Sequence, residues 1–326
     1  MKNNPLVSIV IVGHNETQYL DKCYESILSQ TYKNVEVVYR DNDSDDDSYE
    51  KSVGYSKAFK KEGMSLTVLK NKKYYTYSKS MGMSIGNIEG DYLYFMSPRN
   101  RMDKYFLEEV VKQFEDESVG VVVASMSKQY NGKIIDSRVV ENDEDIIGRL
   151  LNKQDLWIGQ SVRRRNFDVR WSRYNYTFEI YRHIYETFLL GCVSGCAIIE
   201  KTLLVEECLE NILNENEHNM MLIIERHLAY LASFDTARKM KKNEIERYAH
   251  TAIEGKVKMC MAEAVRVYSF GEFDLAKKYL QMAKVFDVDI DCNELYKKIE
   301  KMIFNRDVIS DEVALWCKGE GVLCQI

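Results

Sequence analysis

The sequence lacks several features that mark membrane, secreted or nucleic-acid-binding proteins. None of its apolar runs reaches the roughly 18 residues that a membrane-spanning helix needs, and the longest, residues 188–199, is interrupted by Gly191, Ser194 and Gly195. The formal net charge is −6, which argues against a general nucleic-acid-binding protein. No part of the sequence has the pattern of a secretory signal.

The cysteines point to a reducing environment. Eight are present without any Cys-x-x-Cys pair, and the only close pair is Cys192 and Cys196. Cys23, Cys196 and Cys260 fall inside apolar or helical patterns, where a buried thiol is expected. We therefore expect a cytoplasmic protein. Only two residues are proline, and the many Lys, Asn, Ile and Tyr residues are typical of an AT-rich bacterial genome.

The first 125 residues or so alternate between strand and helix patterns. The chain is long enough for one large domain or two modest ones, and its composition, 45% hydrophobic and 29% charged, is that of a globular protein. Alternating strands and helices predict a doubly wound, mostly parallel α/β sheet. The expected strands are residues 7–12, 35–39, 66–69, 92–96 and 119–124, and the expected helices are 17–30, 47–61, 78–88 and 103–116.

Polar segments follow three of these strands. In an open α/β sheet, ligands bind where the carboxyl ends of strands meet the next loop. Asn15 or Thr17 can also cap the helix after the first strand. We expect the mouth of one site to contain His14, Asn15 and Glu16 from the first loop, Asp41 and Asn42 from the second, and Ser97, Pro98, Arg99 and Asn100 after the strand at 92–96.

Four segments, in order and at the right spacing, carry a family resemblance. They read PLVSIVIVGHNE, VEVVYRDNDSDDDS, NKKYYTYSKSMGMSIGNIEGDY and GDYLYFMSPRN. Over about residues 5–125 the chain resembles the family 2 glycosyltransferases of the GT-A type. The resemblance implies a GT-A-like fold and a nucleotide-sugar donor. It also implies that Asp41 and Asn42 contact the base, with His14, Asn15 and Glu16 flanking the same pocket. For His14 an ordinary loop role fits equally well, and the acidic run 45–47 suits a helix start.

The chain departs from this family at the metal site. Relatives place an Asp-x-Asp pair after the central strand to hold a divalent metal on the donor diphosphate, whereas Ser97, Pro98, Arg99 and Asn100 stand here. Mg²⁺ and Mn²⁺ prefer anionic oxygen ligands, so we do not expect ordinary metal binding. Arg99 could instead bind phosphate, with Lys79 as a second positive charge. Alternatively, Arg99 points into solvent and the donor site is inactive.

Two segments are candidates for the acceptor side. Residues 195–204 resemble the strand and helix that precede the catalytic carboxylate in relatives, which makes Glu217 or His218 the candidate base. An exposed loop is the alternative for both residues. Residues 157–181 are rich in Arg, Trp and Tyr and predict an acceptor-side loop or an oligomer interface, with Arg165, Arg170 and Trp171 as candidate contacts.

The C-terminal part has a helical pattern. We expect a GT-A-like domain over residues 1–235 and a helical region over 236–326. Within it, residues 262–286 resemble one tetratricopeptide-type hairpin, because small and aromatic residues recur at the spacing of two packed helices. A single such unit has to pack on the catalytic domain, on neighbouring helices or on another subunit.

The resemblance therefore implies an inverting glycosyltransferase with a UDP-sugar donor. Its acceptor would be a bacterial surface glycan or a protein, and its donor site would be atypical and independent of metal. The alternative is a catalytically inactive partner subunit or binding module of the same fold. Nucleic acid is not expected as a partner. Peripheral membrane association and a homo-oligomer formed through the C-terminal helices are left open.

Overall fold

The computed structural model of the protein divides into two compact units. It describes residues 4–130, 133–138, 161–165, 194–207, 224–225, 228–229, 231–232, 235, 238–239 and 248–320. The described residues up to 239 belong to the first unit, and those from 248 onward belong to the second.

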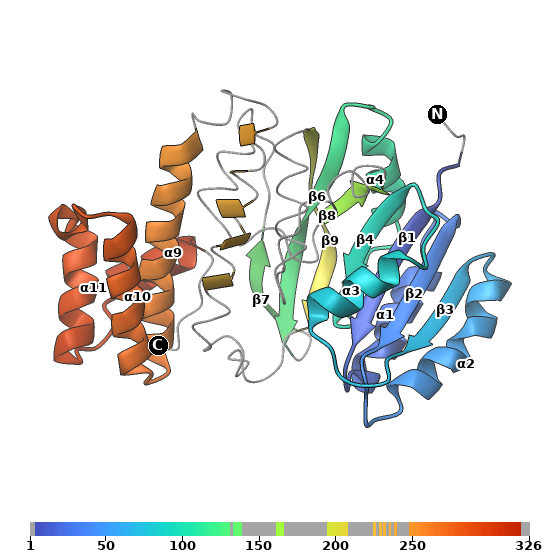
Figure 1. Cartoon of the computed structure of the whole chain (residues 1–326), viewed down its shortest axis with the longest axis horizontal. Helices are drawn as coiled ribbons and strands as arrows, with labels where there is room; N and C mark the ends of the chain where they lie inside the picture. Colours follow the sequence, from blue (N-terminus) through green and yellow to red (C-terminus); the bar gives the residue numbers. More distant parts are fainter. Residues whose placement is uncertain are drawn as a thin grey trace. The chain divides into compact units, whose positions relative to one another are not determined.

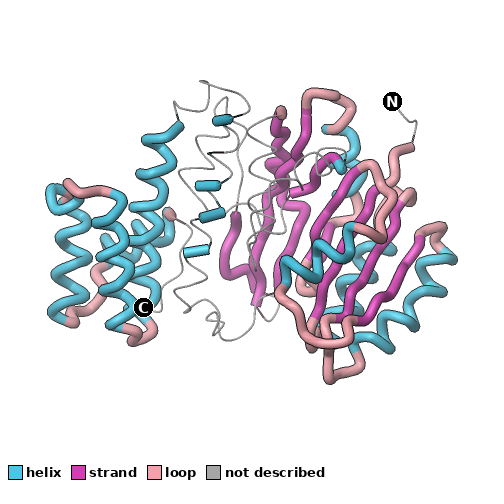
Figure 2. The backbone as a smooth tube through the Cα atoms, in the orientation of Figure 1, coloured by secondary structure: helices cyan, strands magenta, loops and turns pink. Residues whose placement is uncertain are grey.

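The first unit is built around a mixed β-sheet (Figures 1 and 2). Among the described residues its order is β3-β2-β1-β4-β8-β6-β9-β5, with β7 paired to β6. All of these strands except β5, β7 and β8 run in one direction, so the predicted mostly parallel sheet is confirmed. The strands are β1 (Val7–Gly13), β2 (Val35–Asp41), β3 (Ser65–Lys70), β4 (Tyr92–Met96), β5 (Asn100–Met102), β6 (Val119–Tyr130), β7 (Lys133–Arg138), β8 (Ser161–Arg164) and β9 (Gly195–Glu207).

The strand order reverses beside β1. From β1 the chain builds outward through β2 to β3, and then returns to place β4 on the other side of β1. In the two parallel ladders Gly13 lies opposite Asp41, and Ile11 lies opposite Met96. The loops that follow β1, β2 and β4 therefore leave the sheet at one edge, and the reversal between β1 and β4 creates a crevice there.

Helices cover both faces of this sheet, as a doubly wound fold requires (Figure 1). On one face, side chains of α1 (Thr17–Leu28), α2 (Ser48–Lys61) and α4 (Phe106–Gln113) form one hydrophobic cluster with the odd-numbered residues of β1. On the other face, α3 (Tyr77–Ile85) packs against Val10 and Val12. Because both faces of β1 are buried, its sequence is apolar on both faces except for Ser8, whose hydroxyl donates to Glu36.

The strand β8 corrects one expectation from the sequence. Residues 157–181 predicted a loop, yet residues 161–164 form a strand between β4 and β6. Arg163 is buried and its guanidinium carbon lies 4.8 Å from the centre of the Phe95 ring. Arg164 donates to the carbonyl oxygens of Phe114 and Val119, at 2.6 Å each. These arginines therefore belong to the sheet, and Arg164 ties it to the end of α4.

The strand β9 corrects a second expectation. Residues 195–204 predicted a strand followed by a helix, but the strand continues to Glu207. It pairs in parallel with β6, through irregular register, and antiparallel with β5. The expectation that a helix begins within residues 195–204 is therefore wrong, since the backbone groups there pair with two neighbouring strands.

The second unit is helical throughout its described part (Figure 2). Gly271, with a φ of 84°, forms the turn between the first two helices, which pack together as a hairpin. The predicted all-helical C-terminal region is confirmed, whereas its likeness to a tetratricopeptide repeat stays a prediction. No helix in the part of the chain that the structure describes is both long and apolar enough to cross a membrane. The elements are α9 (Ala249–Ser269), α10 (Phe273–Phe286), the 3-10 helix η3 (Ile290–Cys292), α11 (Glu294–Asn305) and α12 (Asp311–Gly319).

A pair of glycine substitutions tests this packing. At Gly90 a Cβ atom would collide with the Ser8 hydroxyl and lie 2.8 Å from the carbonyl oxygen of Leu6, so we expect Gly90→Ala to lower the free energy of unfolding by about 2 kcal/mol. At Gly54, inside α2, a Cβ would meet no atom within 4 Å, and Gly54→Ala should raise it by about 0.5–1 kcal/mol. Urea unfolding measures both changes, and equal effects would contradict the packing described here.

Candidate active site

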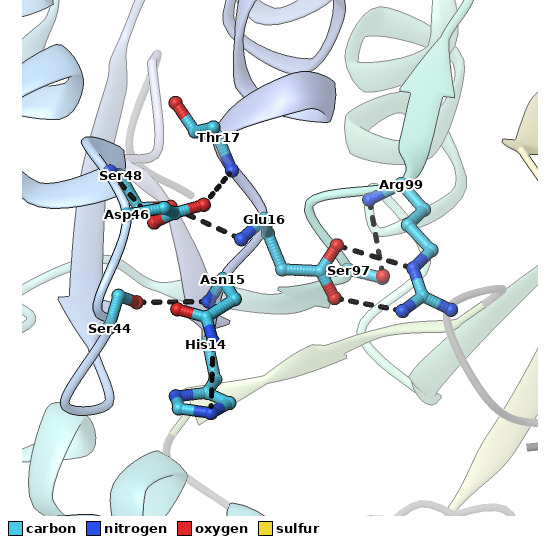
Figure 3. A network of polar contacts seen from close by, with 9 residues as sticks. All are labelled: His14, Asn15, Glu16, Thr17, Ser44, Asp46, Ser48, Ser97 and Arg99. Atoms are coloured by element: carbon cyan, nitrogen blue, oxygen red, sulfur yellow. Dashed lines mark hydrogen bonds and ion pairs between the residues drawn. The ribbon is translucent and has the colours of Figure 1, made fainter.

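Cross-loop hydrogen bonds join the segments that follow β1 and β2 (Figure 3). Asn15 and Asp43 both adopt left-handed backbone conformations, with φ of 55° and 64°. The backbone N–H of Asn15 donates to Ser44 Oγ at 3.0 Å, and Asn15 Oδ1 accepts from the N–H of Asp45 at 2.8 Å. His14 Nδ1 lies 3.1 Å from the carbonyl oxygen of Asn42. The structure thus brings His14 and Asn15 beside the second loop.

Side chains between β2 and the start of α2 also bind the free N–H groups at the start of α1. The N–H of Glu16 donates to Ser48 Oγ at 3.1 Å, and the N–H of Thr17 donates to Asp46 Oδ2 at 3.0 Å. Burial acts to raise the pKa of Asp46, but hydrogen bonds from Ser48 and Thr17 outweigh it and leave this pKa lowered. Neither Asn15 nor Thr17 caps α1, which corrects that expectation. Asp46 has the structural role that a helix-starting acidic turn implies.

Asp41 places a buried carboxylate at the carboxyl end of β2. Its side chain is fully buried, and Oδ2 accepts from the N–H of Ser44 at 3.2 Å. The second oxygen, Oδ1, is also buried and has no hydrogen-bond partner among the described residues. A buried acceptor without a donor is costly, and a hydroxyl or N–H group of a ligand would satisfy it.

Asn42 is used inside the protein. Its Oδ1 accepts from Asn71 Nδ2 at 2.7 Å, from Ser80 Oγ at 3.0 Å and from the N–H of Tyr75 at 3.1 Å. Its Nδ2 donates to the carbonyl oxygen of Tyr75 at 2.8 Å. Three donors fill the capacity of a carbonyl oxygen with two lone pairs. Asn42 therefore holds the segment before α3 in place, and its contact with a donor base stays a prediction.

Arg40 supports this arrangement from inside the sheet and was not found from the sequence. The residue is 7% exposed, and its guanidinium donates to Asn71 Oδ1 at 3.1 Å, which orients the amide that bonds Asn42. Burial lowers the pKa of Arg40. The only signal in the sequence was a charged residue at the end of an apolar strand. Its other acceptors are Ser84 Oγ, the carbonyl oxygen of Met83 and Asn87 Oδ1.

Arg99 and Glu16 form an ion pair between the loops that follow β4 and β1 (Figure 3). Arg99 Nη2 lies 3.1 Å from Glu16 Oε1, and Arg99 Nε lies 3.3 Å from Oε2. The guanidinium also lies 5.5 Å from the centre of the Tyr19 ring. The side chains of Arg99 and Glu16 are 27% and 14% exposed, so Arg99 does not simply point into solvent.

The segment Ser97–Asn100 does not fit a divalent metal ion. Ser97 Oγ accepts from the N–H of Arg99 at 3.3 Å, and Asn100 is buried as the first residue of β5. In the part of the chain that the structure describes, Asn100 Oδ1 has no hydrogen-bond partner. A hydroxyl, a proline ring, a guanidinium and a buried amide offer none of the anionic oxygens that Mg²⁺ and Mn²⁺ prefer. Within the described ranges no group of three His, Cys, Asp or Glu residues could hold a metal.

Gly13 brings three strand ends close together. A Cβ atom on Gly13 would lie 2.8 Å from the hydroxyl oxygen of Tyr39 and 3.4 Å from Cγ of Pro98. Both β2 and the loop after β4 therefore approach the end of β1 through the space that a larger side chain would fill. Pro98 is buried there, and the next residue along the chain is Arg99.

The remaining predicted site residues divide into three groups. Lys79 is exposed on α3, with Nζ 4.2 Å from the centre of the Tyr75 ring. The N–H of Arg165 donates to the carbonyl oxygen of Asp91, just before β4 begins. Asp91 and Ser97 are six positions apart along the strand, about 20 Å, so the backbone of Arg165 lies away from the edge that holds Ser97, and its acceptor-side role stays a prediction. Glu217, His218, Arg170 and Trp171 lie outside the described residues.

Substitution of Asn42 tests its internal role. Asn42→Leu leaves the buried donors of Asn71, Tyr75 and Ser80 without their acceptor, so we expect the free energy of unfolding to fall by about 3 kcal/mol. Asn42→Asp keeps the acceptor oxygen, but when ionised it buries a charge and sets an oxygen against the carbonyl oxygen of Tyr75; at acidic pH, where the carboxyl is protonated and can donate there, a loss of about 1 kcal/mol is expected. Urea unfolding followed by circular dichroism measures both, and equal losses would argue against the network.

Glu16 should make the stability depend on pH. Burial raises its pKa above the ordinary value of 4.5, and Arg99 offsets this only in part. Since the folded protein then holds the proton more tightly than the unfolded chain, the stabilisation is fully present below 4.5 and is lost as pH rises through the raised pKa. From about pH 4 to 7, wild type should lose unfolding free energy relative to Glu16→Gln. A constant difference across chemical denaturation series would contradict this.

Solved structures share the fold. S. aureus TarS in complex with UDP-GlcNAc superposes with a TM-score of 0.64 at 13% identity, over 94% of this chain and 93% of that one. The mannosyltransferase PcManGT from Pyrobaculum calidifontis, in complex with GDP-Man and Mn²⁺, has a TM-score of 0.57 at 13% identity, over 98% of this chain and 85% of that one. These likenesses confirm the GT-A-like fold that the sequence motifs predicted.

Sequence relatives agree with that fold. An uncharacterized glycosyltransferase from Haemophilus influenzae is 26% identical over 48% of this chain and 45% of its own length. Glycosyltransferase GlyG from Streptococcus pneumoniae is 30% identical over 37% of this chain and 38% of its own length. The chain thus spans less than half the length of either curated relative. The family model described as glycosyl transferase family 2 matches residues 8–206, well over half of the sequence, and the chain therefore belongs to that family.

Proposed function

We propose that this protein is an inverting glycosyltransferase with a UDP-sugar donor, acting on a bacterial surface glycan or on a protein. Membership of the family supports sugar transfer from a nucleotide-sugar. TarS, which shares the fold, was solved with UDP-GlcNAc, and this supports uridine as the base. The likeness to a structure that holds GDP-Man makes guanosine the base to test against it.

The reaction defines what the site has to do. An acceptor hydroxyl oxygen attacks the anomeric carbon, the bond from that carbon to the β-phosphate oxygen breaks, and the nucleoside diphosphate leaves. The acceptor proton passes to a base, for which Glu217 and His218 remain the candidates. Negative charge grows on the leaving diphosphate, so the site needs a fixed positive charge at that point.

The position of Arg99 carries the proposal. It stands where relatives place a metal-binding carboxylate, in the crevice at which ligands bind to open α/β sheets. A guanidinium can bind two phosphate oxygens at once and stays charged at every relevant pH. We propose that Arg99 neutralises the diphosphate without a divalent metal, and that Lys79 of α3 supplies a second positive charge. The orphaned Oδ1 of Asp41 would accept a hydrogen bond from the nucleoside.

A non-catalytic role is the second candidate, and two observations favour it. Glu16 already pairs with Arg99, and the side-chain oxygen of Asn42 is filled by internal donors. A partner subunit or binding module of this fold would retain such contacts without ever binding a donor.

Nucleotide binding separates the two candidates. We expect UDP and UDP-GlcNAc to raise the melting temperature of wild type equally in EDTA and in Mn²⁺, because binding to the native state stabilises it. Arg99→Gln should weaken UDP binding by roughly tenfold or more, the loss of a charge-assisted contact of about 1.5–3 kcal/mol. Calorimetric titration measures the affinities, with GDP and GDP-Man as competitors.

A surface cation away from the candidate site supplies the control for nucleotide affinity. Lys33→Gln removes a cation of a surface ion pair with Glu62 and should leave nucleotide affinity unchanged. Binding that requires Mn²⁺ would reject the metal-independent site. No stabilisation of wild type by any nucleotide would favour the non-catalytic role.

A further inference from the structure

We infer that Glu16 is an internal competitor of the donor: its carboxylate occupies the place of the diphosphate on Arg99, and the donor binds by displacing it. This inference rests on the proposed nucleotide-sugar site and adds the group that regulates access to it. The carboxylate is an anion with two oxygens, and both face Arg99 nitrogens, at 3.1 and 3.3 Å. A phosphate group uses a guanidinium in the same two-point manner.

The location of the pair makes the competition direct. Glu16 follows β1 and Arg99 follows β4, the two parallel neighbours between which the strand order reverses. Ligands of open α/β sheets bind in the crevice at this reversal. The ion pair therefore bridges the place where the diphosphate has to lie.

The backbones on both sides are fixed, so only side chains need to move. The N–H of Glu16 is held by Ser48 Oγ at 3.1 Å. The carbonyl oxygen of Arg99 accepts from the N–H of Glu207 at 3.0 Å, which ties the loop after β4 to β9. Arg99 retains 27% exposure of its side chain, so a ligand can reach the guanidinium from solvent. Exchange of partners then requires a rotation of the Glu16 side chain and no refolding.

Electrostatics requires that the carboxylate give way. A diphosphate carries two or more negative charges, and an ionised carboxylate a few ångströms away repels each of them strongly in a partly buried site. Glu16 can relieve this repulsion by rotating away or by taking up a proton. Burial already raises the pKa of Glu16, which favours proton uptake. The charged and titratable groups that face it are Arg99, Asp46, His14, Cys23, Tyr39 and Tyr77.

A purely structural ion pair makes the opposite prediction. If Glu16 only positioned Arg99 for the donor, its removal would loosen the guanidinium and weaken nucleotide binding. If Glu16 competes with the donor, its removal frees the guanidinium and strengthens binding. The sign of the change in affinity therefore distinguishes the two roles.

The experiment is a calorimetric titration of full-length protein with UDP in EDTA. We expect Glu16→Gln to lower the Kd for UDP about five- to tenfold, the range that corresponds to loss of one partly exposed ion pair. Glu16→Asp keeps the charge on a shorter side chain that cannot reach both nitrogens, and its Kd should fall between the two. Glu62→Gln, which removes the carboxylate of a surface pair with Lys33, serves as the matched control and should bind UDP as wild type does.

The pH profile supplies a second readout that a structural role would not move. Wild-type affinity for UDP should rise as pH falls through the raised pKa of Glu16, and this rise should be missing from Glu16→Gln. Titration of the UDP phosphate affects the affinity of both proteins equally, so it cancels when wild type is compared with Glu16→Gln. The inference is overturned if wild type binds UDP and Glu16→Gln or Glu16→Asp binds it equally or more weakly. If no nucleoside diphosphate binds wild type or any variant, the proposed function fails, and the inference fails with it.

Discussion

The parallel pairing of β1 with β2 on one side and β4 on the other is the constraint on which the rest of the structure depends. Because both faces of β1 are buried, a shift of register by one residue would turn its apolar side chains to the wrong layer. The fixed register sets Gly13 opposite Asp41 and Ile11 opposite Met96. Loops that are far apart in the sequence therefore begin at one edge, and every contact of the candidate site follows from that alignment.

Two charged side chains at this edge are held by different means. Arg40 is nearly buried, and its charge is satisfied by amide, hydroxyl and carbonyl oxygens around the end of α3. Carbonyl oxygens at a helix C-terminus carry partial negative charge, so this is a favourable place for a cation. Arg99 is held instead by one carboxylate, Glu16, at the start of α1. The first arrangement is shared among several partners and suits a permanent role, whereas the second depends on one partner that can be exchanged.

Local patterns in the sequence were sufficient to predict the strands and helices of the doubly wound sheet. They were insufficient to predict which side chains contact one another. The apolar run at Val7–Val12 and the polar turns after each strand fixed the expected sheet and the edge where the site lies. Arg163 and Arg164 could not be recognised as strand residues, since charged runs are typical of loops and their partners, Phe95 in β4, Phe114 after α4 and Val119 in β6, are distant in the sequence. The pairing of Glu16 with Arg99 joins residues 83 positions apart, so no local pattern could reveal it.

Gly13 has a consequence for the packing at the end of β1. The hydroxyl of Tyr39 and the ring of Pro98 both lie against the spot where any other residue would carry its first side-chain carbon. A methyl group there would lie 2.8 Å from the hydroxyl oxygen of Tyr39, which would have to move, and in contact with the ring of Pro98, the residue before Arg99. The lack of a side chain at position 13 therefore lets β2 and the loop after β4 lie this close to the end of β1.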